Sequence, residues 1–277
     1  MKKNFLLILL AWFSSIETNG QNLVLNPGFE EYWQCPPAAS SFNGFVKHWE
    51  TFLSAAYLSN CNPSIQYIPS TSLYGYQPAL SGSAYITIVA YTQFHNPNRR
   101  AYVQGSLNMA LKEDSIYCVS YYVSLRDRST TAIQNVDLYL SDTLVRGNGG
   151  YNLGHINPQI KSKQMLDDSV NWTRVSGFYQ AKGGEEYLVI GNFRDNNRTT
   201  VKNSDHTYNP YMAFYFIDDV SVVPVNVTPP ALGPDTALCK SEFPYTLKAP
   251  QGFDSYEWNG EVGEDSLVVG EAGLYSL

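Results

Sequence analysis

The clearest signal in the chain is an apolar residue at every second position, which is the period of a β-strand with one buried face. This pattern recurs in short stretches separated by turn-forming Gly, Pro and Asn residues. The predicted strands are residues 22–32, 83–91, 100–107, 115–127, 135–142, 172–181, 186–193 and 211–225. No amphipathic helix longer than about two turns is evident. The sequence therefore predicts an all-β fold, an antiparallel β-sandwich of the jelly-roll type.

The same period predicts which side chains face the core. Residues 135–142 should form a half-buried strand with Asp137 and Tyr139 on its outer face. In the last predicted strand the inward row is Phe214, Phe216, Asp218, Val220 and Val222. A carboxylate in such a row must be paired, protonated or bound to a cation. Asp219 should lie on the opposite face, in solvent.

The order of segments predicts export and two domains. Residues 1–20 have the charged start and short apolar run of a signal peptide, so we expect cleavage near Gln21 and a secreted or cell-surface protein without a later transmembrane segment. Residues 21–226 form the sandwich, and 227–234 form a Pro-rich linker. Residues 235–277 contain shorter strands, and we expect the sequence to stop inside this second β domain.

Composition and cysteine positions narrow the classes of function. The formal net charge of −7 argues against non-specific nucleic-acid binding. Cys35 and Cys61 lie in loop-like sequence and are predicted to form a disulfide, which export permits. Cys118 lies in a strand pattern and is expected to be a free thiol, and Cys239 has no obvious partner.

Catalysis has little support in the sequence, so we expect no enzyme activity. The chain contains no HExxH, CxxC or GxSxG motif. Its adjacent acidic pairs, 167–168 and 185–186, would point to opposite faces of a strand and so make no acid/base pair.

Several motifs resemble those of carbohydrate-binding β-jelly-roll modules, which are related to the galactose-binding-like fold. They are "NLVLNPGFE" at 22–30, Trp49, "WTRVSGFYQA" at 172–181 and "FIDDVSV" at 216–222. In that family the Glu of the first motif and the first Asp of the last one commonly hold a structural calcium ion. The resemblance thus implies a calcium site at Glu30 and Asp218, which are also the hard oxygen ligands that Ca²⁺ prefers. Alternatively, Asp218 accepts hydrogen bonds from backbone amides or pairs with an Arg.

A narrower resemblance is to the N-terminal modules of large secreted Bacteroidetes proteins of the type IX secretion or gliding-motility-associated kind. It rests on "NPGFEEYWQCP", "YGYQPALSGSAYITI", "AYVQGSL" and "CVSYYVSLRDRST". The stretch "LGPDTALCKSEFPYTLKAPQGFDSYEWNG" is similar to the start of an Ig-like or PKD-like repeat. This resemblance implies that residues 235–277 are a truncated Ig/PKD-like domain.

Sugar binding uses flat aromatic rings together with planar polar side chains. The candidate ligand-binding residues are Trp33, Trp49, Tyr74, Tyr76, Phe94 and Tyr102, with Arg99, Arg100 and Gln104 as polar partners. Any one of these rings could instead pack in the core or at a sheet edge. We expect a secreted, non-catalytic module that binds glycan or another cell-surface component. The alternatives are an adhesin spacer acting through protein contacts, and an ancillary module of a glycan-processing enzyme.

Overall fold

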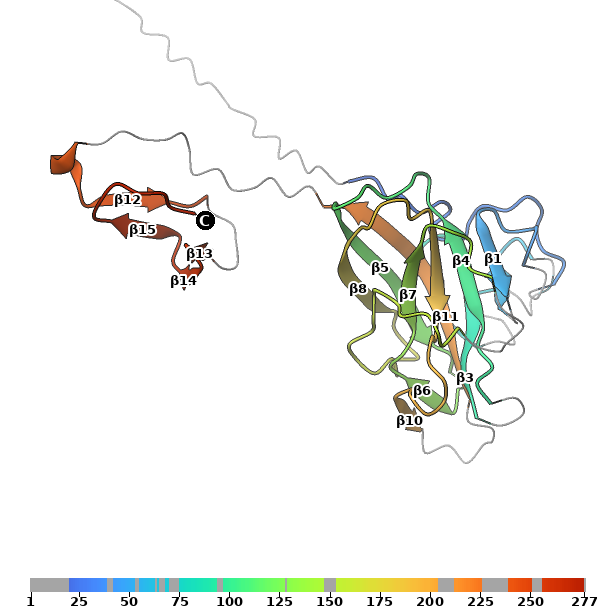
Figure 1. The fold of residues 1–277 in the computed structure, drawn as a ribbon. Helices are drawn as coiled ribbons and strands as arrows, with labels where there is room; N and C mark the ends of the chain where they lie inside the picture. Colours follow the sequence, from blue (N-terminus) through green and yellow to red (C-terminus); the bar gives the residue numbers. More distant parts are fainter. Residues whose placement is uncertain are drawn as a thin grey trace, which may run out of the picture. The chain divides into compact units, whose positions relative to one another are not determined.

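The computed structural model describes residues 20–38, 42–52, 55–62, 64, 68–69, 75–93, 97–127, 129–146, 153–203, 212–225, 239–250 and 256–276. The chain divides into two compact units between Val225 and Asn226 (Figure 1). Residues 1–19 of the expected signal peptide, and all of the expected linker at 227–234, lie outside the described ranges.

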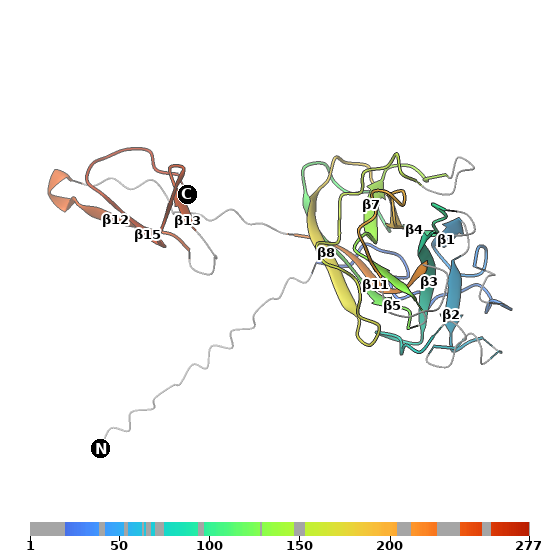
Figure 2. The ribbon, with the colours of Figure 1, turned by 90° about the horizontal axis from the view of Figure 1, so that it is seen from below.

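The first unit is an antiparallel β-sandwich, which confirms the predicted fold class (Figures 1 and 2). One sheet has the order β2 (Ala56–Ser59), β3 (Ala84–Thr92), β11 (Met212–Pro224), β5 (Ile116–Leu125), β8 (Thr173–Gln180). The other has the order β1 (Trp49–Phe52), β4 (Tyr102–Ser106), β9 (Tyr187–Gly191), β7 (Asp137–Ser141). A separate pair joins β10 (Val201–Asn203) to β6 (Thr131–Ile133). The main core lies between the two large sheets and draws side chains from both.

Seven of the eight predicted strands are present, with ends within a few residues of the expected ones. The predicted strand at 22–32 was wrong, because this segment makes only isolated bridges at Val24 and Tyr32. It nevertheless joins the sheets, since the Leu23 amide donates to the carbonyl of Val222 on β11 and the Leu25 amide donates to that of Ser106 on β4. The short strands β1, β2, β6 and β10 were not predicted.

The predicted core row of β11 was right for Val220 and Val222 but wrong for Phe216 and Asp218, because a β-bulge interrupts the strand. The register against β5 shifts between Asp218 and Ser221, and Asp219 adopts a positive φ of 47°. Before the bulge, Tyr215 and Ile217 face the main core, and after it Val220 does. A bulge adds one residue and so changes which side chains face inward. Asp218 therefore does not share one core row with both its earlier and its later neighbours.

The outer face of the five-stranded sheet has a small core of its own. Phe216 packs there with Leu58 and Tyr85, and Trp172 covers them. The indole N–H of Trp172 donates to the carbonyl of Pro78, at 3.0 Å. The segment 75–81 thus covers part of this face, and Asp218 is buried beneath it.

Asp137 lies on the outer face of β7, as predicted, but it is buried rather than exposed. The Ser162 amide donates to Oδ1 of Asp137 at 3.0 Å, because the segment around Ile160 pairs with Leu138 and covers the carboxyl. The alternation of β7 predicted the direction of this side chain correctly. It could not predict that a distant segment covers it.

The cysteines follow the prediction. Cys35 and Cys61 form a disulfide, and Cys118 and Cys239 are free. The bond ties the segment that carries Trp33 to the turn after β2. Within the described ranges, no helix is long and apolar enough to cross a membrane.

In the described part of the second unit, the strands form two antiparallel pairs. β12 (Tyr245–Lys248) pairs with β15 (Ser266–Val269), and β13 (Tyr256–Trp258) pairs with β14 (Glu261–Gly263). A single 3-10 turn, η2 (Lys240–Glu242), precedes them. The indole N–H of Trp258 donates to the Glu264 carbonyl and thereby closes the turn after β14.

Candidate functional site

The first unit has a hollow of about 210 Å³ beside the edge of the four-stranded sheet. Glu50 on β1 and Gln104 on β4 are register partners. Side chains of directly opposed residues lie on the same face, and Trp49 fills the core face, so Glu50 and Gln104 point outward. The hollow is lined by Trp33, Gly44, Val46, His48, Trp49, Glu50, Gln104, Ser106 and Leu144. It thus brings together three of the predicted ligand-binding residues: Trp33, Trp49 and Gln104.

Trp33 is the exposed aromatic residue of this hollow. Its side chain is 73% exposed, although its backbone amide donates to the Phe45 carbonyl at 2.7 Å. Lys47 Nζ lies 4.8 Å from the centroid of the ring and 3.6 Å from Glu31 Oε2. A cation beside the ring face favours one orientation of the indole. The structure therefore presents a large, flat apolar surface in a supported position.

Gln104 supplies a planar polar group in the hollow. Its side chain is almost fully buried, and its Oε1 accepts a hydrogen bond from the Val145 amide at 2.8 Å. This bond fixes the amide plane and leaves the NH₂ group as the donor end. Glu50 lies directly across the strand pair and is exposed. A ring, a fixed amide and a carboxylate can together contact the apolar face and the hydroxyl groups of a sugar.

Trp49 and Tyr102 have structural roles instead. The indole N–H of Trp49 donates to the Asn26 carbonyl, and its ring packs against Phe29 at 4.7 Å. The hydroxyl of Tyr102 donates to the Asn192 carbonyl and accepts from the Leu153 amide. Desolvation by burial raises the pKa of Tyr102 to about 12. Trp49 reaches the rim of the hollow only as part of its wall.

The structure places Arg100 in the interior rather than on a binding surface. Its guanidinium donates to the Asn196 side chain at 2.7 Å and to the carbonyls of Arg99 and Arg194, and it lies 5.2 Å from the Tyr91 ring. Burial lowers the pKa of Arg100 to about 10. This side chain joins the start of β4 to the 194–196 turn.

The remaining aromatic candidates do not join Trp33. Tyr76 is exposed, but it lies on the segment that covers the other sheet, where its amide donates to Asp127. Arg99 is partly buried at the end of the β3–β4 connection. Tyr74 and Phe94 lie outside the described residues.

The two predicted calcium ligands both contact the segment 80–84. Asp218 accepts hydrogen bonds from the amides of Leu80 at 2.9 Å and of Asp219 at 2.8 Å. Glu30 accepts from the amides of Ser83 at 2.7 Å and of Ala84 at 2.8 Å. Backbone amides therefore supply some of the hydrogen bonds that each carboxylate can accept. For Asp218 this is one of the alternatives that the sequence left open.

Asp219 was expected in solvent, but its carboxylate approaches Asp218. Oδ1 of Asp219 accepts from the Ser81 hydroxyl at 2.6 Å, while the Ser81 amide lies 3.5 Å from Asp218 Oδ2. A Cβ atom built on Gly28 would lie 3.3 Å from Asp219 Oδ1 and 3.7 Å from Asp218 Oδ1. Burial, and secondly the charge of Asp219, raises the pKa of Asp218 to about 8.

Oxygen atoms of the two carboxylates thus both lie near Gly28, and a hard cation between them would relieve both the desolvation and the repulsion. The residues present fit a calcium ion at the Asp218–Asp219 pair in this respect. Among the described residues, however, no group of three or more His, Cys, Asp or Glu side chains converges as a metal site.

Sequence reasoning missed Glu50, His48 and Asp219. Trp49 is buried and Glu50 is exposed at the start of β1, but "WETF" at 49–52 has no strict alternation that would have marked Glu50 in the sequence. His48 is at a positive φ of 66°, just before β1, and no sequence signal marks it. The role of Asp219 depends on the bulge, which two adjacent Asp residues do not reveal.

Comparisons with known proteins gave structural matches only. No family model matches the chain, and no curated protein matches it in sequence. The CBM22-1 xylan-binding domain of Xyn10C from Paenibacillus barcinonensis is 15% identical over 76% of this chain and 98% of that domain, with a TM-score of 0.39.

Two further matches come from other organisms. The C-terminal family 22 carbohydrate-binding module of Clostridium thermocellum Xyn10B is 12% identical over 72% of this chain and 96% of that one, with a TM-score of 0.34. The K3 cleaved adhesin domain of Lys-gingipain from Porphyromonas gingivalis is 12% identical over 64% and 92%, with a TM-score of 0.35. Similarity at this level does not assign a function to this chain.

Proposed function

We propose that the first unit is a non-catalytic glycan-binding module and that the hollow beside Trp33 is its binding site. The observation that carries the proposal is the exposed Trp33 ring next to the fixed amide of Gln104 and the carboxylate of Glu50. Single exposed rings are common on protein surfaces, so the significance of the Trp33 ring lies in the polar groups beside it. Its flat face suits the C–H face of a sugar, and the polar pair suits the hydroxyl groups.

The size and charge of the hollow narrow the class of glycan. About 210 Å³ is below the usual range for enclosed small-molecule sites, which begins at about 300 Å³. The hollow therefore suits one or two sugar rings of a longer chain, with the rest in solvent. Glu31 is paired with Lys47, whereas Glu50 lines the hollow itself, and its carboxylate repels anionic groups. We propose a neutral glycan.

A glycan array, followed by calorimetry on the best ligand, tests the proposal. Trp33→Ala should weaken binding by at least about tenfold, since it removes the stacking surface. Phe178→Ala is the matched control, because Phe178 on β8 is also 73% exposed. Absence of binding to any neutral glycan, or equal binding by Trp33→Ala and wild type, would contradict the proposal. The alternative role of an adhesin spacer would then be favoured.

We further propose that calcium is a structural ion of this unit, bound by Asp218 with Glu30 and Asp219 nearby. The raised pKa of Asp218 beside a second carboxylate supports it. An ion there would join β11 to the 80–84 segment and the N-terminal segment. It would take no part in binding sugar, because Trp33 lies by the other sheet.

The proposed setting is extracellular. Export by the N-terminal signal, followed by secretion or display on the cell surface, agrees with the disulfide between Cys35 and Cys61. An Ig-like or PKD-like identity for residues 235–277, as part of a Bacteroidetes surface protein, agrees with the short antiparallel pairs of the second unit. An ancillary role beside a glycan-processing domain would use the same site.

A further inference from the structure

The second unit contains a strand whose outer edge is unpaired among the described residues. β15 pairs only with β12, in the register Thr246 opposite Val268 and Leu247 opposite Leu267. The Ala249 amide donates to the Asp265 carbonyl at 2.8 Å, which marks this pair as hydrogen-bonded. Hydrogen-bonded and non-hydrogen-bonded pairs alternate in an antiparallel ladder. Val268 and Ser266 therefore direct their backbone N–H and C=O groups away from β12.

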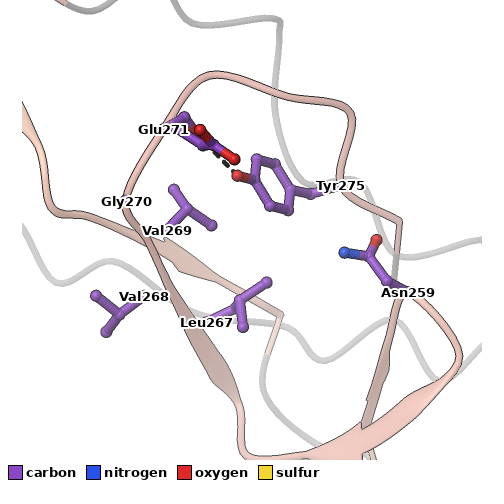
Figure 3. A pocket seen from close by; sticks show the side chains of 7 residues that line it. All are labelled: Asn259, Leu267, Val268, Val269, Gly270, Glu271 and Tyr275. Carbon is purple, nitrogen blue, oxygen red and sulfur yellow. Dashed lines mark hydrogen bonds between the residues drawn. The ribbon is translucent and has the colours of Figure 1, made fainter. Parts of the chain in front are cut away.

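A groove of about 480 Å³ runs beside β15. Its lining comes from β15, from the segment after it and from Asn259, and includes no residue of β12. Figure 3 shows Tyr275 and Asn259 across the groove from Val269 and Leu267. The far wall is held in place, because the Tyr275 hydroxyl donates to the Glu271 carbonyl at 2.8 Å and the Asn259 amide donates to that of Ser276.

The exposed edge of β15 lacks the usual protection against added strands. Native edge strands commonly carry Lys or Pro, which discourage pairing with another chain. β12 has both, since Pro244 precedes it and Lys248 ends it. β15 reads Ser-Leu-Val-Val, and its Val268 side chain is 64% exposed. Of the two edges of this strand pair, that of β15 is thus the less protected against a further strand.

Charge decides which kind of strand would fit. Residues 226–277 contain eight acidic residues and two lysines, so they carry a net charge of −6 out of the −7 of the whole chain. Glu264, Asp265 and Glu271 flank β15 directly. A second copy of this unit would be repelled, whereas a basic segment would be attracted.

We propose that β15 and its groove bind an extended, basic segment of another polypeptide, which adds to the sheet as a third strand antiparallel to β15. Backbone hydrogen bonds to Val268 and Ser266 supply the pairing, and alternate apolar side chains contact Leu267 and Val269. Basic side chains on the other positions lie on the face of Val268, where the net charge of −6 on residues 226–277 attracts them. This interaction is independent of the proposed glycan site in the first unit.

Short peptides test the proposal on the full chain. The probe is the capped hexapeptide Val-Lys-Val-Lys-Val-Lys, compared with its counterpart in which Glu replaces each Lys. The lysine peptide should bind and should weaken as salt is raised, and the glutamate peptide should not bind. Two further lysine peptides, N-methylated at the valines or at the lysines, should differ, because only one of them keeps the amides that pair with β15.

Val268→Pro is the matching protein variant. It removes an N–H that faces the open edge, a position where proline is tolerated, and should weaken binding about tenfold. Thr246→Pro, directly opposite on β12, is the control and should leave the affinity unchanged. The indole N–H signal of Trp258 reports whether the unit stays folded. If Val268→Pro unfolds the unit, the two N-methylated peptides test the proposed strand pairing on the unaltered protein.

Three results would overturn the proposal: equal binding of the lysine and glutamate peptides, equal binding of the two N-methylated peptides, or unchanged binding by a folded Val268→Pro variant. Sedimentation that shows self-association lost in Val268→Pro would also overturn it, because the occupant would then be a second copy.

Discussion

Asp218 and Asp219 are adjacent in the sequence, yet both carboxylates contact Ser81. In a regular strand their side chains would point to opposite faces. The bulge between Asp218 and Ser221 and the positive φ of Asp219 bring them to one side. We therefore expect this pair to respond to both protons and cations.

The metal-free protein should lose stability as the pH rises from about 4 to about 8. The pKa of Asp218 is raised to about 8 in the folded state from an ordinary value near 3.8, so the folded state binds more protons across this window. The stabilisation that protonated Asp218 provides is complete below the pKa of the unfolded state. It is lost as the pH rises through the pKa of the folded state. Melting temperatures of calcium-depleted protein measure this loss, and Asp218→Asn should show less of it.

Calcium should stabilise the wild type more at pH 8 than at pH 5, because the cation competes with the proton of Asp218. Differential scanning calorimetry with calcium-depleted and calcium-loaded protein measures the effect. Asp218→Asn should remove the response and Asp219→Asn should weaken it. Asp195→Asn, at a half-buried carboxylate paired with Arg198, is the control. Identical melting of the wild type with and without calcium would sink the calcium proposal.

Asp137→Asn should stabilise the protein at pH 8 and have little effect at pH 4. Burial raises the pKa of Asp137 to about 6, and within the described residues its Oδ2 has no hydrogen-bond partner. Ionised Asp137 is thus unfavourable in this buried position, and the neutral side chain of Asn, which has the same shape, removes the cost of burying a charge. The gain should be on the order of 1–3 kcal/mol. Urea unfolding at the two pH values checks it, and a loss of stability at pH 8 would contradict this reasoning.

Gly105→Ala should destabilise the first unit by roughly 1–3 kcal/mol. A Cβ atom at Gly105 would lie 2.6 Å from the Trp49 ring, which is buried and held by its bond to Asn26. Gly177→Ala is the control, because its Cβ would meet only the end of the Ile160 side chain, at 3.3 Å. Thermal unfolding that gives the same change for both variants would show that Trp49 can move aside.

Peptide mapping without reduction should recover Cys35 linked to Cys61, and a thiol reagent should label Cys239 faster than Cys118. Cys239 is exposed, whereas Cys118 is only partly so on β5. Replacing both Cys35 and Cys61 by Ser should cost roughly 3 kcal/mol of stability. It should also weaken glycan binding, since the bond ties down the segment with Trp33. A Cys118 disulfide to either loop cysteine would refute the pairing.

The sequence by itself determined the long strands and their inward faces, because alternation of apolar residues is a local property. The alternation within residues 115–127 puts Tyr117, Val119, Tyr121 and Val123 on one face, and this row on β5 lies in the main core. The loop positions of Cys35 and Cys61 likewise predicted their bond. Trp33 and Gln104 were found as residue types, but not as neighbours, because they come from separate segments.

Only the tertiary structure decided which side chains of β11 face the core, which outward side chains are buried and which residues form the candidate site. A bulge depends on the neighbouring strand, so Asp219 and the row on β11 could not be read from alternation. Whether an outward side chain is buried depends on which distant segment covers it, as Ser162 does for Asp137. Trp49 and Tyr102 look like sugar-binding rings in the sequence, but the packing around them places both indole and phenol in the interior. The site exists only where the sheet edge brings Trp33, Glu50 and Gln104 together, since contacts between distant segments form only when the sheets pack.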